Sequence, residues 1–304
     1  MSTADTASQS ASYPQGGLLA RHPLTFYFLI AFAFSWLMFL PGVLTYFGVL
    51  NLSDSVVGVL SITGLLGPIL SGFIMTAVTE GGPGIRRWLS RIVRWRVGLR
   101  WYLFALIGLP LVMVLATIIF RPGALESFQT LAPLSVLPYL GAFVFMVLIG
   151  GPLFEEPGWS GFAQPRLQRV HSPLVGGLIL GSLWALWHLP GFLIPSQNLT
   201  DIPPRGTILD FVVFALALIA LRLIIQWVFN NTKGSVLMAI LVHASWNTFY
   251  SAALIQLFPA PSVLGSYLNL TIDVGALALL VVALTRGRLG YQQGEEPGTA
   301  TAPT

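Results

Sequence analysis

The stretch VLPYLGAFVFMVLIGGPLFEE (residues 136–156) places 19 residues without a charged side chain directly before two adjacent glutamates. A run of this length crosses the roughly 30 Å hydrocarbon core of a bilayer when it is α-helical. A second run, TFYFLIAFAFSWLMFL (residues 25–40), has the same character. These stretches predict transmembrane helices rather than the core of a soluble domain.

The composition of the whole chain agrees with this prediction. Of its 304 residues 55% are hydrophobic and 9% are charged, and the mean hydropathy is +0.79. A soluble domain carries about 25% charged residues, so this chain lacks the polar groups to cover a water-exposed surface. It has no cysteine, which excludes disulfides, thiol catalysis and cysteine-ligated metal sites.

Eight apolar stretches are long enough to span a bilayer, with boundaries accurate to several residues. They cover residues 24–48, 55–78, 101–120, 136–156, 173–194, 208–229, 235–256 and 266–285. The sequence therefore predicts an all-α integral membrane protein, a bundle of about eight transmembrane helices at residues 21–289. We expect disordered tails at residues 1–20 and 290–304, which are rich in small and polar residues.

The basic residues predict the orientation of this bundle. In an eight-helix arrangement, 12 of the 15 lysines and arginines fall on one side, and only Arg121 and Arg205 fall on the other. Because positive charges favour the cytoplasmic side, both termini are predicted to be cytoplasmic, in a multi-pass protein of the plasma membrane. The pI of 9.7 does not indicate nucleic-acid binding, since the arginines lie between apolar runs.

The loop IRRWLSRIVRWRVGLRW (residues 85–101) alternates arginines with tryptophan and aliphatic residues. This pattern is typical of an amphipathic helix at the membrane interface. The alternative is a surface that recruits anionic lipid or the tail of a substrate.

Ionisable side chains within the predicted spans are candidates for a functional site, because a charge at membrane depth is costly. Glu155 and Glu156 end the fourth span, and two neighbouring carboxylates suit general acid or base catalysis. His188 and His243 lie within the fifth and seventh spans, and Asn247 follows His243 by one helical turn. The alternative for the glutamates is that they simply end a helix at the interface.

The depth of these side chains depends on the fourth helix. If it continues as far as Arg166, the glutamates lie about 15–17 Å below the interface, at the level of both histidines and of Asn247. If it stops at Pro157, the glutamates lie at the surface and no shared site forms.

Three motifs on separate predicted spans carry a resemblance to a known family. They are EEPGWSGFAQPRLQ (155–168), LWALWHLP (183–190) and HASWNT (243–248). In this order they resemble the CPBP family of CAAX proteases and bacteriocin-processing enzymes, which are eight-helix intramembrane endopeptidases. The resemblance covers about residues 85–250, and the motifs themselves lie within residues 136–250.

The resemblance implies hydrolysis of a peptide bond in a membrane-associated substrate, either lipid-modified (CAAX type) or bacteriocin-like. Carried over, Glu155 is the base that activates a water molecule, and Glu156 assists it or orients the site. His188 polarises that water, while His243 and Asn247 stabilise the oxyanion.

The same resemblance leaves the catalytic type open. Family members have also been described as metalloproteases, and Glu155, His188 and His243 are the side chains that would bind zinc here. The contiguous HExxH signature is absent, so a metal-independent glutamate mechanism is the preferred interpretation.

The chain departs from the family pattern at one position. The first motif usually reads Glu-Glu-x-x-x-Arg, and here Ser160 stands where the arginine is expected. This change puts rate or substrate choice in doubt more than the fold.

Two other functional classes remain open. Gly158-Trp159-Ser160-Gly161 resembles the nucleophile motif of rhomboid serine proteases, with Ser160 as the nucleophile. A catalytically inactive scaffold, immunity protein or small transporter would keep the fold without proteolysis. In that case Arg222 and Asp273 could form an intramembrane ion pair.

Overall fold

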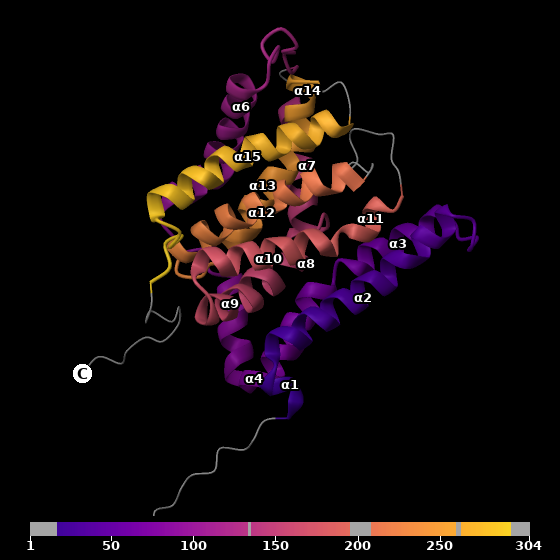
Figure 1. Cartoon of the computed structure of the whole chain (residues 1–304), viewed down its shortest axis with the longest axis vertical. Coiled ribbons are helices and arrows are strands. Elements are labelled where there is room, and N and C mark those ends of the chain that lie inside the picture. The colour runs from indigo at the N-terminus through magenta and orange to yellow at the C-terminus, as the bar shows by residue number, and fades with distance from the viewer. Residues whose placement is uncertain (1–16, 133–134, 195–207, 260–262, 293–304) are drawn as a thin grey trace, which may run out of the picture.

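A computed structural model describes residues 17–132, 135–194, 208–259 and 263–292, which form helices and no strand (Figure 1). Within them six helices are long and apolar enough to cross a membrane. These are Pro23–Tyr46, Asp54–Ile92, Leu99–Phe120, Val136–Val170, Ile208–Asn231 and Gly265–Thr285. The predicted all-helical membrane fold is confirmed, whereas the count of eight spans and the side of the termini stay predictions.

The fifth and seventh predicted spans are not among these six helices, which accounts for the difference from the predicted eight. They contain α10 (Pro173–Trp187) and α13 (Val236–Phe249), which are 15 and 14 residues long. At about 1.5 Å per residue α10 is shorter than the hydrocarbon core, whereas α13 with the helical turns that follow it is long enough but less apolar. α10 ends at His188, while α13 continues into a π-helical turn at Tyr250–Leu254 and the short α14 (Ile255–Leu257).

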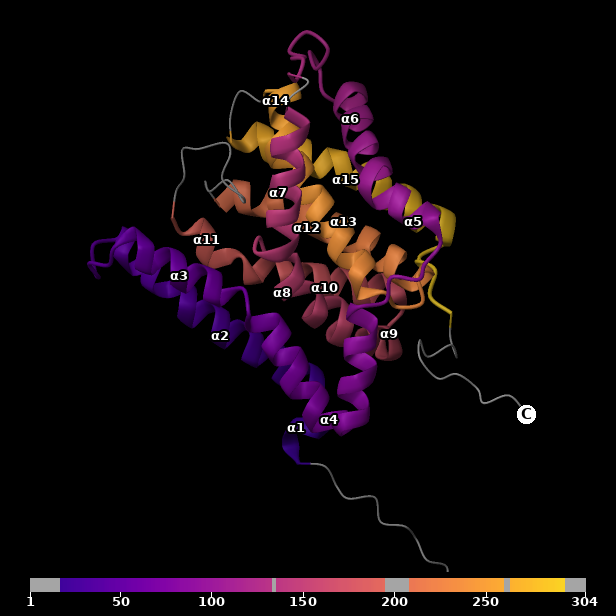
Figure 2. The ribbon, with the colours of Figure 1, turned by 180° about the vertical axis from the view of Figure 1, so that it is seen from behind.

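The N-terminal helices lie together at one end of the molecule (Figures 1 and 2). They are α1 (Leu18–Arg21), α2 (Pro23–Tyr46), α3 (Asp54–Gly64) and α4 (Gly67–Ile92). α2 packs against both α3 and α4. The predicted tails lie largely outside the described residues, although α1 overlaps the end of the first.

The arginine-rich loop is helical only in its first half. α4 bends at Gly81, whose φ of 60° is in the left-handed region that glycine tolerates, and then continues to Ile92. Residues 93–98 are irregular, and the chain resumes as α5 (Leu99–Leu103). The predicted amphipathic helix over residues 85–101 is therefore interrupted at residues 93–98.

The opposite end of the molecule is built from α6 (Leu109–Phe120) and α15 (Val263–Thr285), which pack against each other. A π-helical turn, Phe104–Gly108, joins α5 to α6. On the outer faces, large apolar side chains such as Leu137, Leu279 and Leu284 are more than 70% exposed. Such exposure is costly in water and favourable against lipid, which supports the membrane assignment.

The central helix is α12 (Ile208–Asn231), which packs against α10 and α15. In its most apolar window 61% of the residues are buried, against 11–33% in the other five candidate spans. A helix that is apolar all round needs protein or lipid on every side. Because α12 is enclosed by protein, a charged side chain on it is held away from solvent.

The fourth span is a broken helix. α7 (Val136–Leu148) ends before Gly151, where φ is 117°, and α8 (Pro152–Gly158) begins at a proline suited to the first helical position. A π-helical segment, Trp159–Ala163, then leads into α9 (Gln164–Val170). The helix thus continues through Pro157 to Val170, which is the arrangement that the predicted site requires.

A close helix crossing fixes α8 against α4. Gly72 lies opposite Gly158, where an added Cβ would come 3.3 Å from the Gly158 Cα. A Cβ on Gly158 would in turn meet the Pro68 carbonyl oxygen at 2.3 Å. Small residues at such crossings let helix backbones approach within a membrane.

Candidate active site

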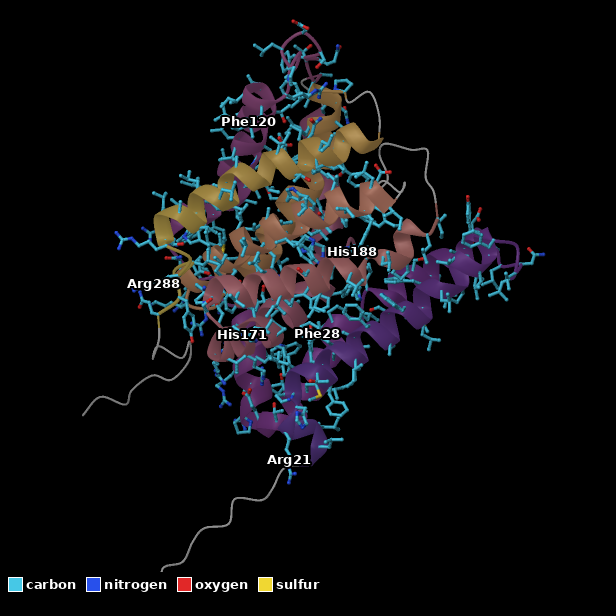
Figure 3. All side chains as sticks on the ribbon, in the orientation of Figure 1. Arg21, Phe28, Phe120, His171, His188 and Arg288 are labelled. Atoms are coloured by element: carbon cyan, nitrogen blue, oxygen red, sulfur yellow. The ribbon has the colours of Figure 1, made fainter. Side chains whose placement is uncertain are left out.

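The two predicted glutamates lie in the interior, on α8 where it meets α10, α12 and α13. Glu155 is 4% exposed and Glu156 is fully buried. His243 on α13 is also buried, and Figure 3 places His188 at the interior end of α10. The structure therefore brings four predicted side chains from three helices into one region.

Glu155 has a largely neutral environment. Its Oε2 accepts a hydrogen bond of 2.7 Å from the indole Nε1 of Trp184, on α10. Its Oε1 lies over the backbone of Gly151, where a Cβ would come within 2.5 Å of that oxygen. A glycine is therefore required at position 151 for two reasons. The backbone there has a positive φ, and the Glu155 carboxylate occupies the space that a Cβ would fill.

Glu156 has three polar partners and a full positive charge beside it. Arg222 Nη1 lies 3.1 Å from Oε2 and 3.4 Å from Oε1. Ser160 Oγ donates to Oε2 at 2.5 Å, and His243 Nδ1 lies 3.1 Å from Oε1. A buried carboxylate needs such a set to offset its lost hydration. This arrangement stabilises the negative charge of Glu156.

The histidine contacts define their tautomers. His188 Nδ1 lies 2.8 Å from the carbonyl oxygen of Trp184, and His243 Nδ1 lies against the Glu156 carboxylate. Because both of these oxygens only accept, each Nδ1 carries a hydrogen and donates it. In both rings Nε2 is then the nitrogen left for a substrate or a water molecule.

Trp184 joins these groups. Its ring lies 5.0 Å from that of His243 and 5.9 Å from that of His188, both edge to face. The Arg222 guanidinium lies 5.8 Å from the same ring. In the sequence Trp184 belongs to the LWALWHLP motif, four residues before His188. Its indole hydrogen bond to Glu155 was not predicted.

Asn247 lies at the edge of this cluster. It is 7% exposed, and its Nδ2 lies 3.6 Å from the sulfur of Met146 on α7. It follows His243 by one turn of α13, as the spacing predicts. Its side chain thus lies toward α7 rather than against the glutamates.

The principal residue that the sequence analysis missed is Arg222. It was considered as a partner of Asp273, but its guanidinium contacts Glu156 and donates to Ser160 Oγ at 2.8 Å. Asp273 instead accepts a hydrogen bond of 2.9 Å from Thr117. The suggested Arg222–Asp273 pair is therefore wrong.

The contacts of Glu156 also involve Ser160, which stands where the family pattern has an arginine. The family pattern has an arginine four residues after Glu156, whereas here the guanidinium beside Glu156 is that of Arg222 on α12, and Ser160 bridges the two side chains. The Ser160 hydroxyl donates to a carboxylate rather than to a histidine, unlike an activated serine nucleophile. The one sequence signal for Arg222 was a charge inside an apolar span.

Among the described residues, no group of three His, Cys, Asp or Glu side chains is placed to hold a metal ion. Glu155, His188 and His243 are directed to separate hydrogen-bond partners. Glu155 Oε1 and the Nε2 atoms of both histidines lie outside these hydrogen bonds, so the zinc site that the resemblance left open stays a prediction.

Fold and site together define an all-helical membrane protein with a buried carboxylate, histidine and arginine cluster. Residues 137–249 match a family model described as "Type II CAAX prenyl endopeptidase Rce1-like". A curated relative, CAAX prenyl protease 2 of Methanococcus maripaludis, is 23% identical over 220 residues, which cover 71% of this chain and 80% of the relative. These matches support the CPBP/CAAX protease family for this chain, and the matched region contains the whole cluster.

Proposed function

We propose that the protein is an intramembrane endopeptidase that cleaves a membrane-associated substrate with a water molecule activated by Glu155. The observation that carries this proposal is the difference between the two glutamates. Glu156 is bound to three side chains, whereas Glu155 is held by one neutral indole donor on Oε2. Its Oε1 is therefore the oxygen suited to take a proton from water.

The reaction needs only acid–base chemistry. Glu155 accepts a proton as the water oxygen bonds to the carbonyl carbon, and His188 orients that water through Nε2. His243 and Asn247 stabilise the oxyanion that forms on the carbonyl oxygen. The protonated Glu155 then passes its proton to the leaving amine as the C–N bond breaks.

Glu156 acts as a positioning residue in this scheme. Its carboxylate fixes the His243 ring by accepting the Nδ1 hydrogen, as an aspartate does in a serine protease triad. Arg222 and Ser160 in turn fix the carboxylate. The α12 arginine therefore acts on the reaction through two intermediate side chains.

The substrate is proposed to be a peptide held in the bilayer. The match to a CAAX prenyl endopeptidase model favours a prenylated C-terminal peptide. A membrane-anchored peptide of bacteriocin-precursor type satisfies the same site. Both present a peptide backbone at the bilayer, and the proposal is supported by the position of the glutamates on a helix long and apolar enough to cross a membrane.

The direct test is cleavage of quenched fluorescent peptides by the purified protein in liposomes. One peptide carries a farnesylated C-terminal cysteine motif and another carries a transmembrane anchor. Glu155→Gln should lower kcat by about 10²–10⁴, whereas Glu126→Gln, the same change on an exposed loop, should leave it unchanged. A chelator should have no effect.

Other outcomes would contradict the proposal. Full activity in Glu155→Gln would show that Glu155 is not the base. Loss of activity on addition of a chelator would show that the reaction requires a metal. Loss in Ser160→Ala with full activity in Glu155→Gln would favour a serine nucleophile. Absence of cleavage with every peptide would favour an inactive scaffold.

A further inference from the structure

A row of polar side chains continues along the helix from the second glutamate. Glu156 is followed at steps of four residues by Ser160, Gln164 and Gln168, and each of the four is at most 5% exposed. Residues four apart lie one above the other on a helix. The row therefore extends from the proposed active site to the end of α9, over about 18 Å of helix.

α12 presents a matching row to this helix. Its polar side chains are also four residues apart: Arg222, Gln226 and Asn230. At the inner end Arg222 Nη2 donates to Ser160 Oγ at 2.8 Å. At the outer end Gln168 Oε1 accepts hydrogen bonds from Gln226 Nε2 at 2.9 Å and from Asn230 Nδ2 at 2.8 Å. The two rows together form a continuous polar seam between the helices.

Gln164 lies between the two ends of the polar seam and differs from its neighbours. Its side chain is 1% exposed, and neither Oε1 nor Nε2 has a hydrogen-bond partner among the described residues. Polar side chains between membrane helices commonly hydrogen-bond to one another and hold the helices together, as Gln168 does. That role does not account for a buried amide without a partner, which is costly at membrane depth.

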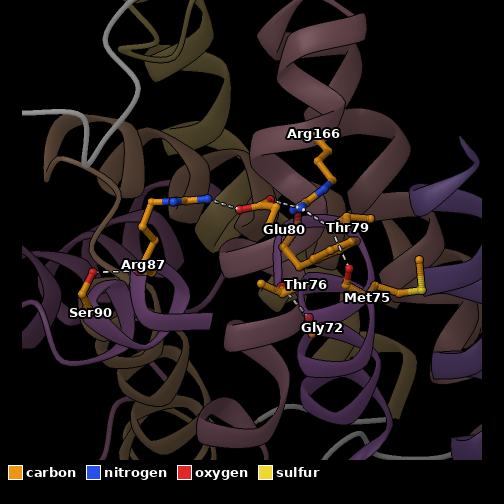
Figure 4. A network of polar contacts seen from close by, with 9 residues as sticks. Gly72, Met75, Thr76, Thr79, Glu80, Arg87, Ser90 and Arg166 are labelled. Carbon is orange, nitrogen blue, oxygen red and sulfur yellow. Dashed lines mark hydrogen bonds and ion pairs between the residues drawn. The ribbon is translucent and has the colours of Figure 1, made fainter. Parts of the chain in front are cut away.

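The position of Gln164 is fixed from the opposite side of α9. Arg166, which projects about 200° away from Gln164, pairs with Glu80 of α4 (Figure 4). It also donates a hydrogen bond of 3.1 Å to the Phe162 carbonyl. Because these contacts hold α9 against α4, the Gln164 amide is held within the seam.

Glycines of α10 form the third side of the seam. A Cβ on Gly177 would come 2.4 Å from Gln226 Oε1, and one on Gly181 would come 3.3 Å from the Cβ of Arg222. At these two positions no apolar side chain of α10 covers the polar groups of α12. Gln226 Oε1 is a second buried atom without a hydrogen-bond partner in the described part of the chain. Each row of the seam therefore contains an amide that is not satisfied by protein.

We propose that water molecules occupy the polar seam beside Gln164 and form a path from the outer end of α9 to the proposed active site. Buried water typically binds polar atoms that have no other partner. One turn of helix rises about 6 Å, and one water molecule with two hydrogen bonds of about 2.8 Å covers that distance. Single water molecules thus suffice to connect Gln164 to Ser160 on one side and to Gln168 on the other.

The path rests on the proposed function and extends it, because hydrolysis consumes one water molecule in each cycle. The hydrocarbon core holds no water, so a hydrolase within it needs a route for this reactant. The inner end of the seam is Glu156, next to the proposed base. At the outer end Arg169 and Asn231, the next residues on the two helices, are exposed. Gln164 is in this scheme a positioning residue for water.

Hydration of the seam is testable without a substrate. The chain has no cysteine, so a single introduced thiol is the only one present. Gln164→Cys and Gln168→Cys place it in the seam, and Ala163→Cys places it at the adjacent, fully buried apolar position. Each protein in liposomes is treated with silver nitrate in chloride-free buffer, and the unreacted thiols are counted with a fluorescent maleimide after unfolding. The melting temperature before treatment establishes that each variant is folded, and Gln226→Cys probes the facing row if Gln164→Cys is not.

Silver ion reaches hydrated space and binds the thiolate, which is the reactive form of cysteine. We expect Gln164→Cys and Gln168→Cys to react at least about tenfold faster than Ala163→Cys. Equal rates in all three would overturn the proposal, because the seam would then be no more hydrated than the apolar side of the helix. Reaction of Gln168→Cys without reaction of Gln164→Cys would overturn it as well, since water would stop at the outer end.

The supply of water to the reaction is tested by two further substitutions in the peptide assay. Gln164→Leu places an apolar side chain in the seam and should lower kcat at unchanged KM. It should not lower the melting temperature, because Gln164 has no hydrogen bond to lose. Gln164→Ser keeps a hydroxyl and leaves room for water, so it should retain more of kcat than Gln164→Leu.

A purely structural role of Gln164 predicts the reverse result. If Gln164→Leu is as active as wild type, or more active than Gln164→Ser, the path is refuted. Failure of the proposed function has a different signature, which is fast silver reaction of Gln164→Cys in a protein that cleaves no peptide. In that case the hydrated seam is confirmed and the endopeptidase is not.

Discussion

Replacing Arg222 by methionine removes the positive charge beside Glu156 and keeps most of the aliphatic side chain. Both side chains are fully buried, and the contact is 3.1 Å. Breaking a buried ion pair from one side costs about 3–5 kcal/mol, because the remaining charge is left unpaired. Ser160 and His243 still donate to the carboxylate, so we expect a loss near 3 kcal/mol.

The informative comparison adds a second change. Ser160→Arg alone should destabilise the protein, because it forces a second guanidinium into space that Arg222 fills. In the Arg222→Met background the same change places a guanidinium one turn after Glu156, with room to reach it. The double variant should therefore recover stability and activity relative to Arg222→Met.

The assay is thermal unfolding in detergent together with peptide cleavage. Arg222→Met should lower the apparent melting temperature by roughly 5–10 °C. Exposed Arg100 supplies a matched control, since Arg100→Met removes one positive charge outside the site. The reasoning is refuted if Arg222→Met is as stable as this control, or if the double variant is no better than Arg222→Met.

Three further substitutions test the other contacts, each by kcat in the peptide assay with the melting temperature as a check on folding. Gly151→Ala should inactivate the enzyme, because its Cβ would lie 2.5 Å from Glu155 Oε1, and near-normal kcat would contradict that position. Trp184→Phe keeps the ring but removes the indole hydrogen bond to Glu155, and a charge-assisted bond of about 1.5–3 kcal/mol predicts a loss of about ten- to hundredfold. Asp273→Asn should retain activity within about twofold, because Asp273 contacts Thr117 rather than Arg222, and a large loss would reopen the suggested Arg222–Asp273 pair.

The membrane fold was predictable because it depends on the length and polarity of apolar runs. The boundaries of the helices were less predictable from the sequence. Residues 136–156 read as one uninterrupted span, yet the helix breaks before Gly151 and restarts at Pro152. Hydropathy does not register this break, because glycine and proline are uncharged and the run remains apolar. Only the combination of Gly151 and Pro152 carried a signal for it.

The site was predictable where spacing along one helix determines it. His243 and Asn247 are one turn apart on α13, and the glutamates are adjacent on α8. The contact of Arg222 with Glu156 joins α12 to α8, and these two residues are 66 positions apart in the sequence. No spacing rule relates two such positions. The charge of Arg222 inside an apolar span marked it as unusual, but did not identify Glu156 as its partner.

Glu155 and Glu156 contact different partners because of helix geometry. Adjacent residues of an α-helix project about 100° apart, so Glu155 and Glu156 cannot face the same partner. On α8 one carboxylate is directed to α10 and its indole, and the other to the arginine of α12 and the histidine of α13. A fixed charge and a base thus arise from two identical side chains, because the neighbouring helices differ. Moving the pair by one residue would bring one carboxylate into the other's place and turn the second about 100° away from both sets of partners, which is why the break at Gly151 and the start at Pro152 determine the chemistry as well as the fold.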